Sequence, residues 1–65
     1  MTLKDIKEAV EAGKTVNWSN SSYQVIKDDK GQFLIAHDNG SAIGLTHQDD
    51  VTLNGKESDF FINPL

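Results

Sequence analysis

The sequence contains no cysteine and no arginine, and its single proline, Pro64, is the last residue but one. Without cysteine, a chain of 65 residues has neither disulfide bonds nor a thiolate zinc site to reinforce its small core, so packing or self-association must stabilise it. No apolar run approaches the roughly 20 residues of a membrane-spanning helix, and the charged N-terminal residues are unlike a signal peptide. We therefore expect a single domain, residues 1–65, located in the cytoplasm.

Positive charge is scarce in this chain. Six lysines stand against ten acidic residues, which gives a formal net charge of −4. Clusters of arginine and lysine supply most of the affinity of proteins for the phosphates of nucleic acids, so direct nucleic-acid binding is not expected. Many acidic surfaces serve solubility alone, and this simpler explanation stands beside any functional one.

The first segment predicts a helix from about Thr2 to Ala12. Thr2 belongs to the residue types preferred at an N-cap, and Asp5 has the position of the acid in a capping box. Gly13 ends the pattern. Apolar residues recur at helical spacing along one narrow stripe, formed by Leu3, Ile6, Ala9 and Val10. Such a stripe is typical of a helix that packs on a sheet.

From Thr15 onward, short β-type runs alternate with residues that turn the chain. The expected strands are Thr15–Trp18, Tyr23–Asp28, Gln32–His37, Ala42–Thr46 and Asp59–Ile62. The predicted fold class is therefore α+β, with one N-terminal helix packed on a small antiparallel sheet of about four to five strands. We expect these strands to form a meander that can curl into a partial barrel.

Turn chemistry predicts how the central strands pair. A three-residue turn ending at Gly31 places Tyr23 opposite His37 and Val25 opposite Ile35. A two-residue turn made of Asn39 and Gly40 places Ala36 opposite Ile43 and Leu34 opposite Leu45.

These two registers assign the apolar side chains to two faces of the sheet. The helix is expected to cover the face that carries Ile26, Leu34, Ala36, Ile43 and Leu45. The second face carries Tyr23, Val25, Phe33 and Ile35 opposite the small residues Ala42 and Gly44. This face needs another cover, and the available large side chains are Trp18, Phe60 and Phe61.

The stretch from His37 to Asp50 holds two histidines and three aspartates, which raises the question of a metal site. In the predicted hairpin, His37 lies beside the turn and His47 at the far end, so about five residues, or roughly 17 Å, separate the two imidazoles. One zinc ion cannot bind both, because it needs ligand nitrogens about 2.1 Å away. We expect no metal site.

Catalytic chemistry has few candidates. There is no cysteine nucleophile, the serines stand in turn-like settings, and the five glycines are dispersed rather than gathered into a phosphate-binding loop. The one pair that can act as acid and base is Tyr23 with His37, which are expected to face each other. A cross-strand aromatic contact explains this pair more simply. A chain of this length has little room to enclose a substrate. We expect a non-enzymatic protein without a cofactor.

Acidic residues at turns and strand ends are the first candidate binding surface. The seven are Asp28, Asp29, Asp38, Asp49, Asp50, Glu57 and Asp59. Carboxylates held apart on a rigid frame can imitate a row of phosphates and occupy a basic nucleic-acid channel, and their field raises the rate of association. In the helix, Lys4 and Lys7 stand four residues before Glu8 and Glu11, so ion pairs should reduce the charge there.

A very short, acidic, cysteine-free chain with a capped helix and a small sheet resembles the compact anti-defence proteins of phages and mobile elements, including anti-CRISPR inhibitors. The resemblance covers size, charge and architecture, and it transfers no residue roles. The resemblance implies a phage protein that acts in the cytoplasm of the host cell. Such a protein would inhibit a host protein or complex by occluding its basic nucleic-acid-binding surface, and DNA mimicry is one form of this inhibition.

An alternative function uses apolar surface in place of charge. The second sheet face, with Tyr23, Val25, Ile35 and Gly44, predicts a small ligand-binding module or a self-associating structural module. In either case the protein would be a monomer or a small homo-oligomer. Salt separates the two hypotheses, since binding between charged surfaces weakens as ionic strength rises and an apolar contact does not.

Overall fold

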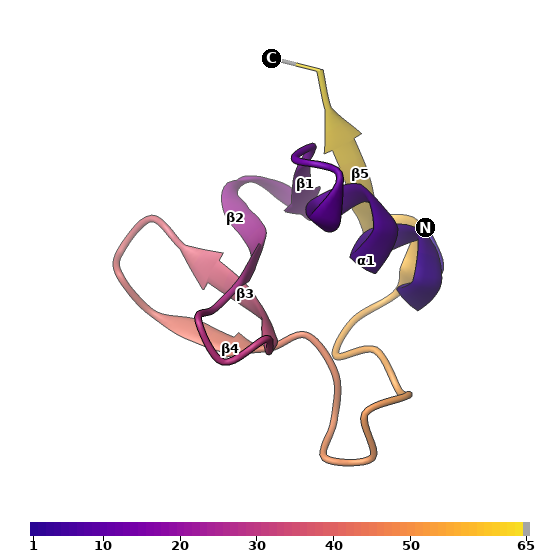
Figure 1. Ribbon diagram of the computed structural model, residues 1–65. Coiled ribbons are helices and arrows are strands. Elements are labelled where there is room, and N and C mark those ends of the chain that lie inside the picture. The colour runs from indigo at the N-terminus through magenta and orange to yellow at the C-terminus, as the bar shows by residue number, and fades with distance from the viewer. Residues whose placement is uncertain (65) are drawn as a thin grey trace.

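Figure 1 shows the computed structural model of the protein, which describes residues 1–64. Its elements in chain order are α1 (Leu3–Glu11), β1 (Thr15–Trp18), β2 (Asn20–Lys27), β3 (Phe33–His37), β4 (Ala42–Gly44), the 3-10 helix η1 (Glu57–Asp59) and β5 (Phe60–Asn63). The strands form one antiparallel sheet in the order β4-β3-β2-β1-β5. One helix packed on a five-stranded antiparallel sheet confirms the predicted α+β class.

The sheet is a meander only from β1 to β4. After β4 the chain crosses the open side of the sheet and returns β5 to the free edge of β1. The sheet is not closed, because no ladder joins β4 to β5. A single bridge between Thr46 and Leu53 lies within the crossing segment.

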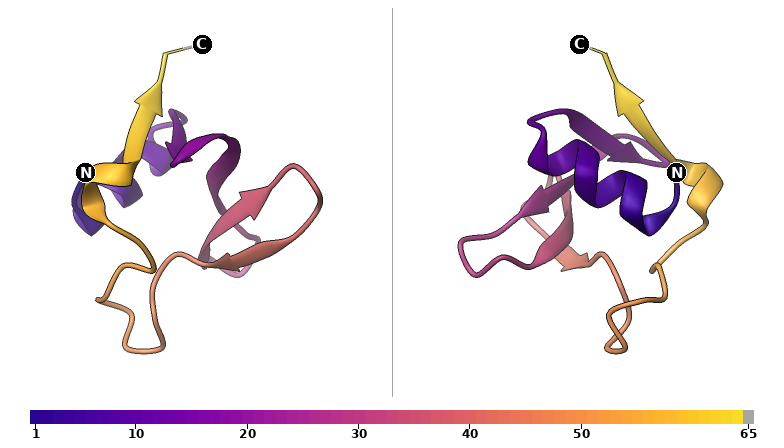
Figure 2. Two further views of the ribbon diagram at one scale, coloured as in Figure 1. Left: turned by 180° about the vertical axis from the view of Figure 1, so that it is seen from behind. Right: turned by 45° about the vertical axis from the view of Figure 1, so that its right-hand side comes forward.

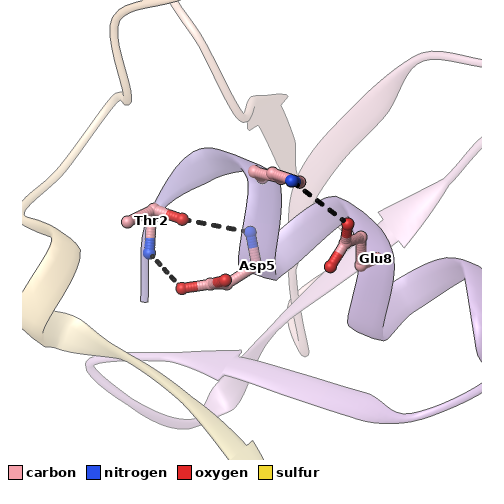
Figure 3. A network of polar contacts seen from close by, with 4 residues as sticks. Thr2, Asp5 and Glu8 are labelled. Atoms are coloured by element: carbon pink, nitrogen blue, oxygen red, sulfur yellow. Dashed lines mark hydrogen bonds and ion pairs between the residues drawn. The ribbon is translucent and has the colours of Figure 1, made fainter.

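Helix α1 begins and ends as the sequence predicts. Thr2 is the N-cap: its Oγ1 accepts a hydrogen bond from the Asp5 amide (3.1 Å), and the Asp5 Oδ2 accepts one from the Thr2 amide (3.2 Å), as Figure 3 shows. The bond from the Thr2 amide, and after it the Thr2 hydroxyl, lower the pKa of the Asp5 carboxyl, because both favour its ionised form. At the other end, Gly13 has a φ of +84° and its amide donates to the Val10 carbonyl.

The β2–β3 hairpin has the predicted register. Tyr23 pairs with His37 and Val25 with Ile35, and the turn closes with Gly31 at a φ of +84°. The Gly31 amide donates to the Asp28 carbonyl in this turn (3.1 Å).

The predicted register of the β3–β4 hairpin is wrong by one residue. Ile35 pairs with Ile43 and Leu34 with Gly44, because the turn has three residues instead of two. Gly40 alone carries the positive φ, +92°, and its amide donates to the His37 carbonyl (3.0 Å). This bond matches the one that Gly31 makes in the preceding hairpin, so both turns follow the three-residue pattern with a left-handed glycine.

The one-residue shift moves the side chains of the last predicted strand to the opposite face. Ile43 and Leu45 therefore lie on the same side as Val25 and Ile35. Helix α1 packs on this side against β1 and β2. Figure 2 shows the helix on one side of the sheet. The buried core consists of Ile6, Ala9, Val16, Val25, Ile35, Leu45 and Phe60. Helix α1 thus covers the face that carries Val25 and Ile35. From the sequence, the large side chains of Trp18, Phe60 and Phe61 were expected to cover this face.

The other large apolar residues divide between core and surface. Trp18 is half-buried and packs against the core, whereas Phe61 is 40% exposed on the edge strand β5. The face of the sheet away from α1 carries the half-buried Ile26, Leu34 and Ala36.

Candidate functional site

The seven acidic candidates do not form one row. Asp28 and Asp29 lie in the β2–β3 turn and Asp38 in the β3–β4 turn, at opposite ends of β3. Asp49 and Asp50 lie in the segment that crosses from β4 to β5. Glu57 and Asp59 belong to η1, just before β5. The fold therefore does not arrange all seven carboxylates in a continuous row like that of a phosphate backbone.

Several acids are occupied by contacts that shape the backbone. The Asp28 Oδ1 accepts hydrogen bonds from the amides of Lys30 (2.9 Å) and Gln32 (2.8 Å), which holds the β2–β3 turn. Asp49 has a similar role in the crossing segment. The side chains of five acids make no hydrogen bond or ion pair within residues 1–64: Asp29, Asp38, Asp50, Glu57 and Asp59.

The helical acids are paired, though one partner differs from the prediction. The Lys4 ammonium lies 4.0 Å from the Glu8 carboxylate, as expected. Figure 3 shows the position of Glu8 on the helix. Glu11 pairs with Lys27 on β2, at 3.2 Å, instead of with Lys7. Lys7 is left over the ring of Phe33, with its ammonium 5.4 Å from the ring centroid.

The most distinct surface feature is the acidic loop, which we define as residues His47–Thr52. It lies in the orange segment that projects from the body of the protein in Figure 1. Its two ends are tied together, since the His47 amide donates to the Thr52 carbonyl (2.8 Å) and Thr46 forms a bridge with Leu53. The loop is therefore a closed turn with a fixed base.

Asp49 holds the loop from within. Its Oδ1 accepts from the amides of Val51 (3.0 Å) and Thr52 (2.9 Å), and its Oδ2 accepts from the Thr52 hydroxyl (2.6 Å). These bonds, first the one from the Thr52 hydroxyl, lower the pKa of Asp49 to about 2. The carboxylate is consequently ionised at any ordinary pH, and the loop keeps its shape.

The tip of the acidic loop combines exposed charge with exposed apolar surface. Asp50 adopts a φ of +63°, and its amide donates to the His47 carbonyl (3.0 Å). The next side chain, Val51, is 70% exposed, more than the other exposed large hydrophobic residues among residues 1–64. Sequence reasoning selected Asp49 and Asp50 but missed Val51. The available signal was the spacing of Asp49 and Thr52, which suits an aspartate that caps the amides following it.

The base of the crossing segment rests on Trp18. A Cβ placed on Gly55 would lie 2.6 Å from the Trp18 Nε1, so only glycine fits against the indole. The Asn54 amide also donates to the Leu45 carbonyl (2.9 Å), which fastens the segment to the end of β4.

A cavity of about 350 Å³ lies beside the acidic loop, lined mainly by residues of β3 and the end of β4 and by one residue of the helix. Its lining includes Lys7, Phe33, His47 and Asp50, so it holds charges of both signs beside an aromatic ring. The acidic loop forms one wall of this cavity.

The two histidines are held apart by the hairpin. His37 pairs with Ser41 beside the β3–β4 turn, through a bond from its amide, whereas His47 follows the other end of β4. The rings of Tyr23 and His37 are 4.4 Å apart in an edge arrangement, and the His37 Nδ1 accepts from the Asn39 amide (3.1 Å). Within residues 1–64, no three side chains among His, Asp and Glu are grouped so that they could hold a metal ion.

The alternative apolar site is part of the core rather than a free face. Val25 and Ile35 are buried, because α1 covers them. Tyr23 packs between Trp18 and His37. Gly44 lies on the opposite side of the sheet, where it pairs with Leu34. The four residues therefore do not form one binding surface.

Comparison of the chain with protein-family models, with curated proteins and with solved structures found no match. None of the helices in residues 1–64 has the length and apolar character needed to cross a membrane.

Proposed function

We propose that this protein is a non-enzymatic interaction module that binds a basic surface of a partner protein with its acidic loop. The observation that carries the proposal is Val51, which is 70% exposed on a loop that Asp49 holds in one shape. Loops that a rigid scaffold positions often carry binding residues, and Val51 beside Asp50 offers a partner an apolar contact and a charge at one place.

Rigidity lowers the cost of binding for such a loop. Ordering a flexible loop at an interface consumes part of the binding free energy, and the internal bonds of Asp49 have already ordered this one. Val51 supplies the apolar centre of a contact, and Asp50 supplies charge at its rim, where complementary charges steer the encounter.

Basic surfaces that accept such a loop are common on proteins that bind nucleic acids. We extend the proposal accordingly to an inhibitor of phage or mobile-element origin that occludes a nucleic-acid-binding surface of a host defence complex. The separation of the seven acids favours occlusion by one loop over imitation of a long stretch of DNA.

The test is affinity capture from a lysate of the host with matched neutralising variants. Asp50→Asn removes one charge from the loop and keeps a residue type that tolerates the positive φ at position 50. Asp29→Asn makes the same charge change at an exposed acid of the β2–β3 turn. We expect wild type and Asp29→Asn to retain the same protein, and Asp50→Asn and Val51→Ser to lose it.

Raising the salt concentration should release the captured protein, because the contact joins opposite charges. Equal capture by wild type and by both loop variants would contradict the proposal, as would capture that withstands high salt.

A further inference from the structure

We propose that the cavity beside the acidic loop binds a small zwitterion, which is a molecule of the size of a free amino acid with one carboxylate, one ammonium and an apolar body. Lys7 binds the carboxylate, Asp50 binds the ammonium, and the ring of Phe33 lies beside the apolar body. The ligand is a small molecule, so the proposal does not rest on the binding of a partner protein by the acidic loop.

Lys7 is a half-buried cation without a counter-charge. Within residues 1–64 its ammonium makes no ion pair and no hydrogen bond. The nearest acid at helical spacing, Glu11, is taken by Lys27 at 3.2 Å. The ring of Phe33 lies 5.4 Å from the Lys7 ammonium, but a ring attracts the charge without neutralising it. Partial burial of an unpaired charge is unfavourable, so a ligand carboxylate would improve the surroundings of Lys7.

Asp50 brings the opposite charge to the same cavity. Its side chain makes no hydrogen bond within the described residues, and no ion pair joins it to Lys7 although both residues line the cavity. The backbone of Asp50 has a φ of +63°, and the bonds that Asp49 makes hold the turn in this form. Backbone conformations of this kind gather at binding sites, where the surrounding structure enforces them. The fold thus presents two unpaired, opposite charges to one cavity.

The rest of the lining suits a compact ligand with an apolar body. Phe33 and Leu34 are half-buried, and Leu45 is buried. Gly31 and Gly44 also line the cavity, so no side chain at these two positions fills it. The volume of about 350 Å³ is near the lower end of the roughly 300–1,000 Å³ of small-molecule pockets. This size fits an amino acid better than a nucleotide or a larger cofactor.

The charges favour a zwitterion over a simple anion or cation. The net charge of −4 repels an anion that approaches the chain. A cation that approaches Asp50 meets Lys7 in the same cavity. A zwitterion has no net charge, so the field of the chain does not oppose it, and each of its ends finds an opposite charge. Gln32 and His47, which also line the cavity, can add hydrogen bonds.

NMR titration of the isotope-labelled protein with L-leucine, L-phenylalanine and 6-aminohexanoate, at low ionic strength, tests the proposal. Each probe carries both charges, and the three differ in apolar body and in the spacing of the charges. We expect at least one probe to bind saturably below about 10 mM. The amides of Gly31, Gly44 and Thr46, which line the cavity, should shift, whereas the amide of Phe61 on β5 should not.

Analogues and variants with one charge removed test the role of each end. N-acetylation of the binding probe removes its ammonium, and amidation removes its carboxylate. Each change should weaken binding about tenfold, because one charged hydrogen bond is lost. Lys7→Met, which keeps most of the aliphatic side chain, and Asp50→Asn should weaken binding by a similar factor. Lys56→Met and Asp29→Asn make the same charge changes outside the lining of the cavity and should bind like the wild type.

The titrations of the wild type need no variant, and a dispersed spectrum must show that each variant is folded. Absence of saturable shifts below about 10 mM with all three probes would overturn the proposal, as would equal binding of the one-charge analogues or unchanged affinity of folded Lys7→Met. Val51 does not line the cavity, so Val51→Ser should still bind the zwitterion, and Lys7→Met should still capture the partner protein. Failure of the ligand site and failure of the proposed function are therefore distinguishable.

Discussion

Gly55→Ala should destabilise the protein strongly, because the new methyl group would lie 2.6 Å from the Trp18 Nε1 and 3.2 Å from the Trp18 Cε2. Forcing an extra methyl group into a packed site costs about 1–3 kcal/mol. Gly55 also has a φ of +154°, a conformation that L-residues avoid, and a left-handed backbone costs roughly 1–2 kcal/mol. Together these terms predict a loss of about 2–5 kcal/mol, against a total stability of roughly 3–10 kcal/mol for a domain of this size.

Urea denaturation followed by tryptophan fluorescence measures this loss directly. Trp18 is the only tryptophan, so its emission reports on the contact that the substitution disturbs. Gly40→Ala is the matched control, because Gly40 also has a positive φ, +92°, but a Cβ there meets no atom within 4 Å. The control should lose only the backbone share, about 1–2 kcal/mol. Equal losses for the two variants would refute the steric contact between Gly55 and Trp18.

Three further predictions concern the core, the helix cap and the pH response of the loop. Leu45→Ala should cost about 2–5 kcal/mol in urea denaturation, and Leu34→Ala less, because Leu45 is 1% exposed in the core and Leu34 is half-buried on the other face. Equal losses of stability for the two variants would contradict the observed register and favour the one predicted from the sequence, in which Leu34 pairs with Leu45. Thr2→Ala should lower the free energy of unfolding by about 1 kcal/mol through loss of the N-cap, whereas Thr2→Ser should retain most of it. The pKa of Asp49 is lowered from 3.8 to about 2. The ionised carboxylate therefore stabilises the folded protein fully above about pH 4, and this stabilisation is lost as the pH falls through 2. NMR titration should give a carboxyl midpoint near pH 2 and show the amides of Val51 and Thr52 exchanging faster below it, and a midpoint near 3.8 would contradict the bonds to Thr52.

The parts of the fold that local sequence determines were predictable. The capping box of Thr2 and Asp5 and the stop at Gly13 depend on residues a few positions apart, and the structure has both. The β2–β3 register was predictable for the same reason, since a left-handed Gly31 fixes the turn length.

The β3–β4 register was not predictable from the Asn-Gly pair alone. Asn39 and Gly40 suit a two-residue turn in which both have positive φ, and equally a three-residue turn in which only Gly40 does. Side-chain contacts accompany the second form: the Asn39 Oδ1 accepts from the amide (2.9 Å) and the hydroxyl (2.7 Å) of Ser41. One residue in the turn then decided which face Ile43 and Leu45 occupy, and with it which face the helix covers.

The candidate site was predictable only as a set of acids. Composition and turn positions select Asp28, Asp49 and Asp50 alike, but they do not show that Asp28 and Asp49 bind backbone amides while Asp50 stays without a side-chain partner. The exposure of Val51 depends on the shape that Asp49 imposes on the loop. That shape follows from contacts rather than from residue type.

The acidic loop traces to the crossing from β4 to β5. Because these strands occupy opposite edges of an open sheet, the connecting segment must pass along its open side. Contacts of Gly55 with Trp18 and of Asn54 with Leu45 fasten that segment near its base, so the residues between Thr46 and Leu53 project as the acidic loop. The same crossing delivers β5 to β1 as the last strand of the sheet, with the Phe60 amide donating to the Glu57 carbonyl where η1 ends. A chain that instead paired β4 with β5 would close the sheet and bury this edge. The open topology therefore presents the charged loop that we propose for a foreign partner.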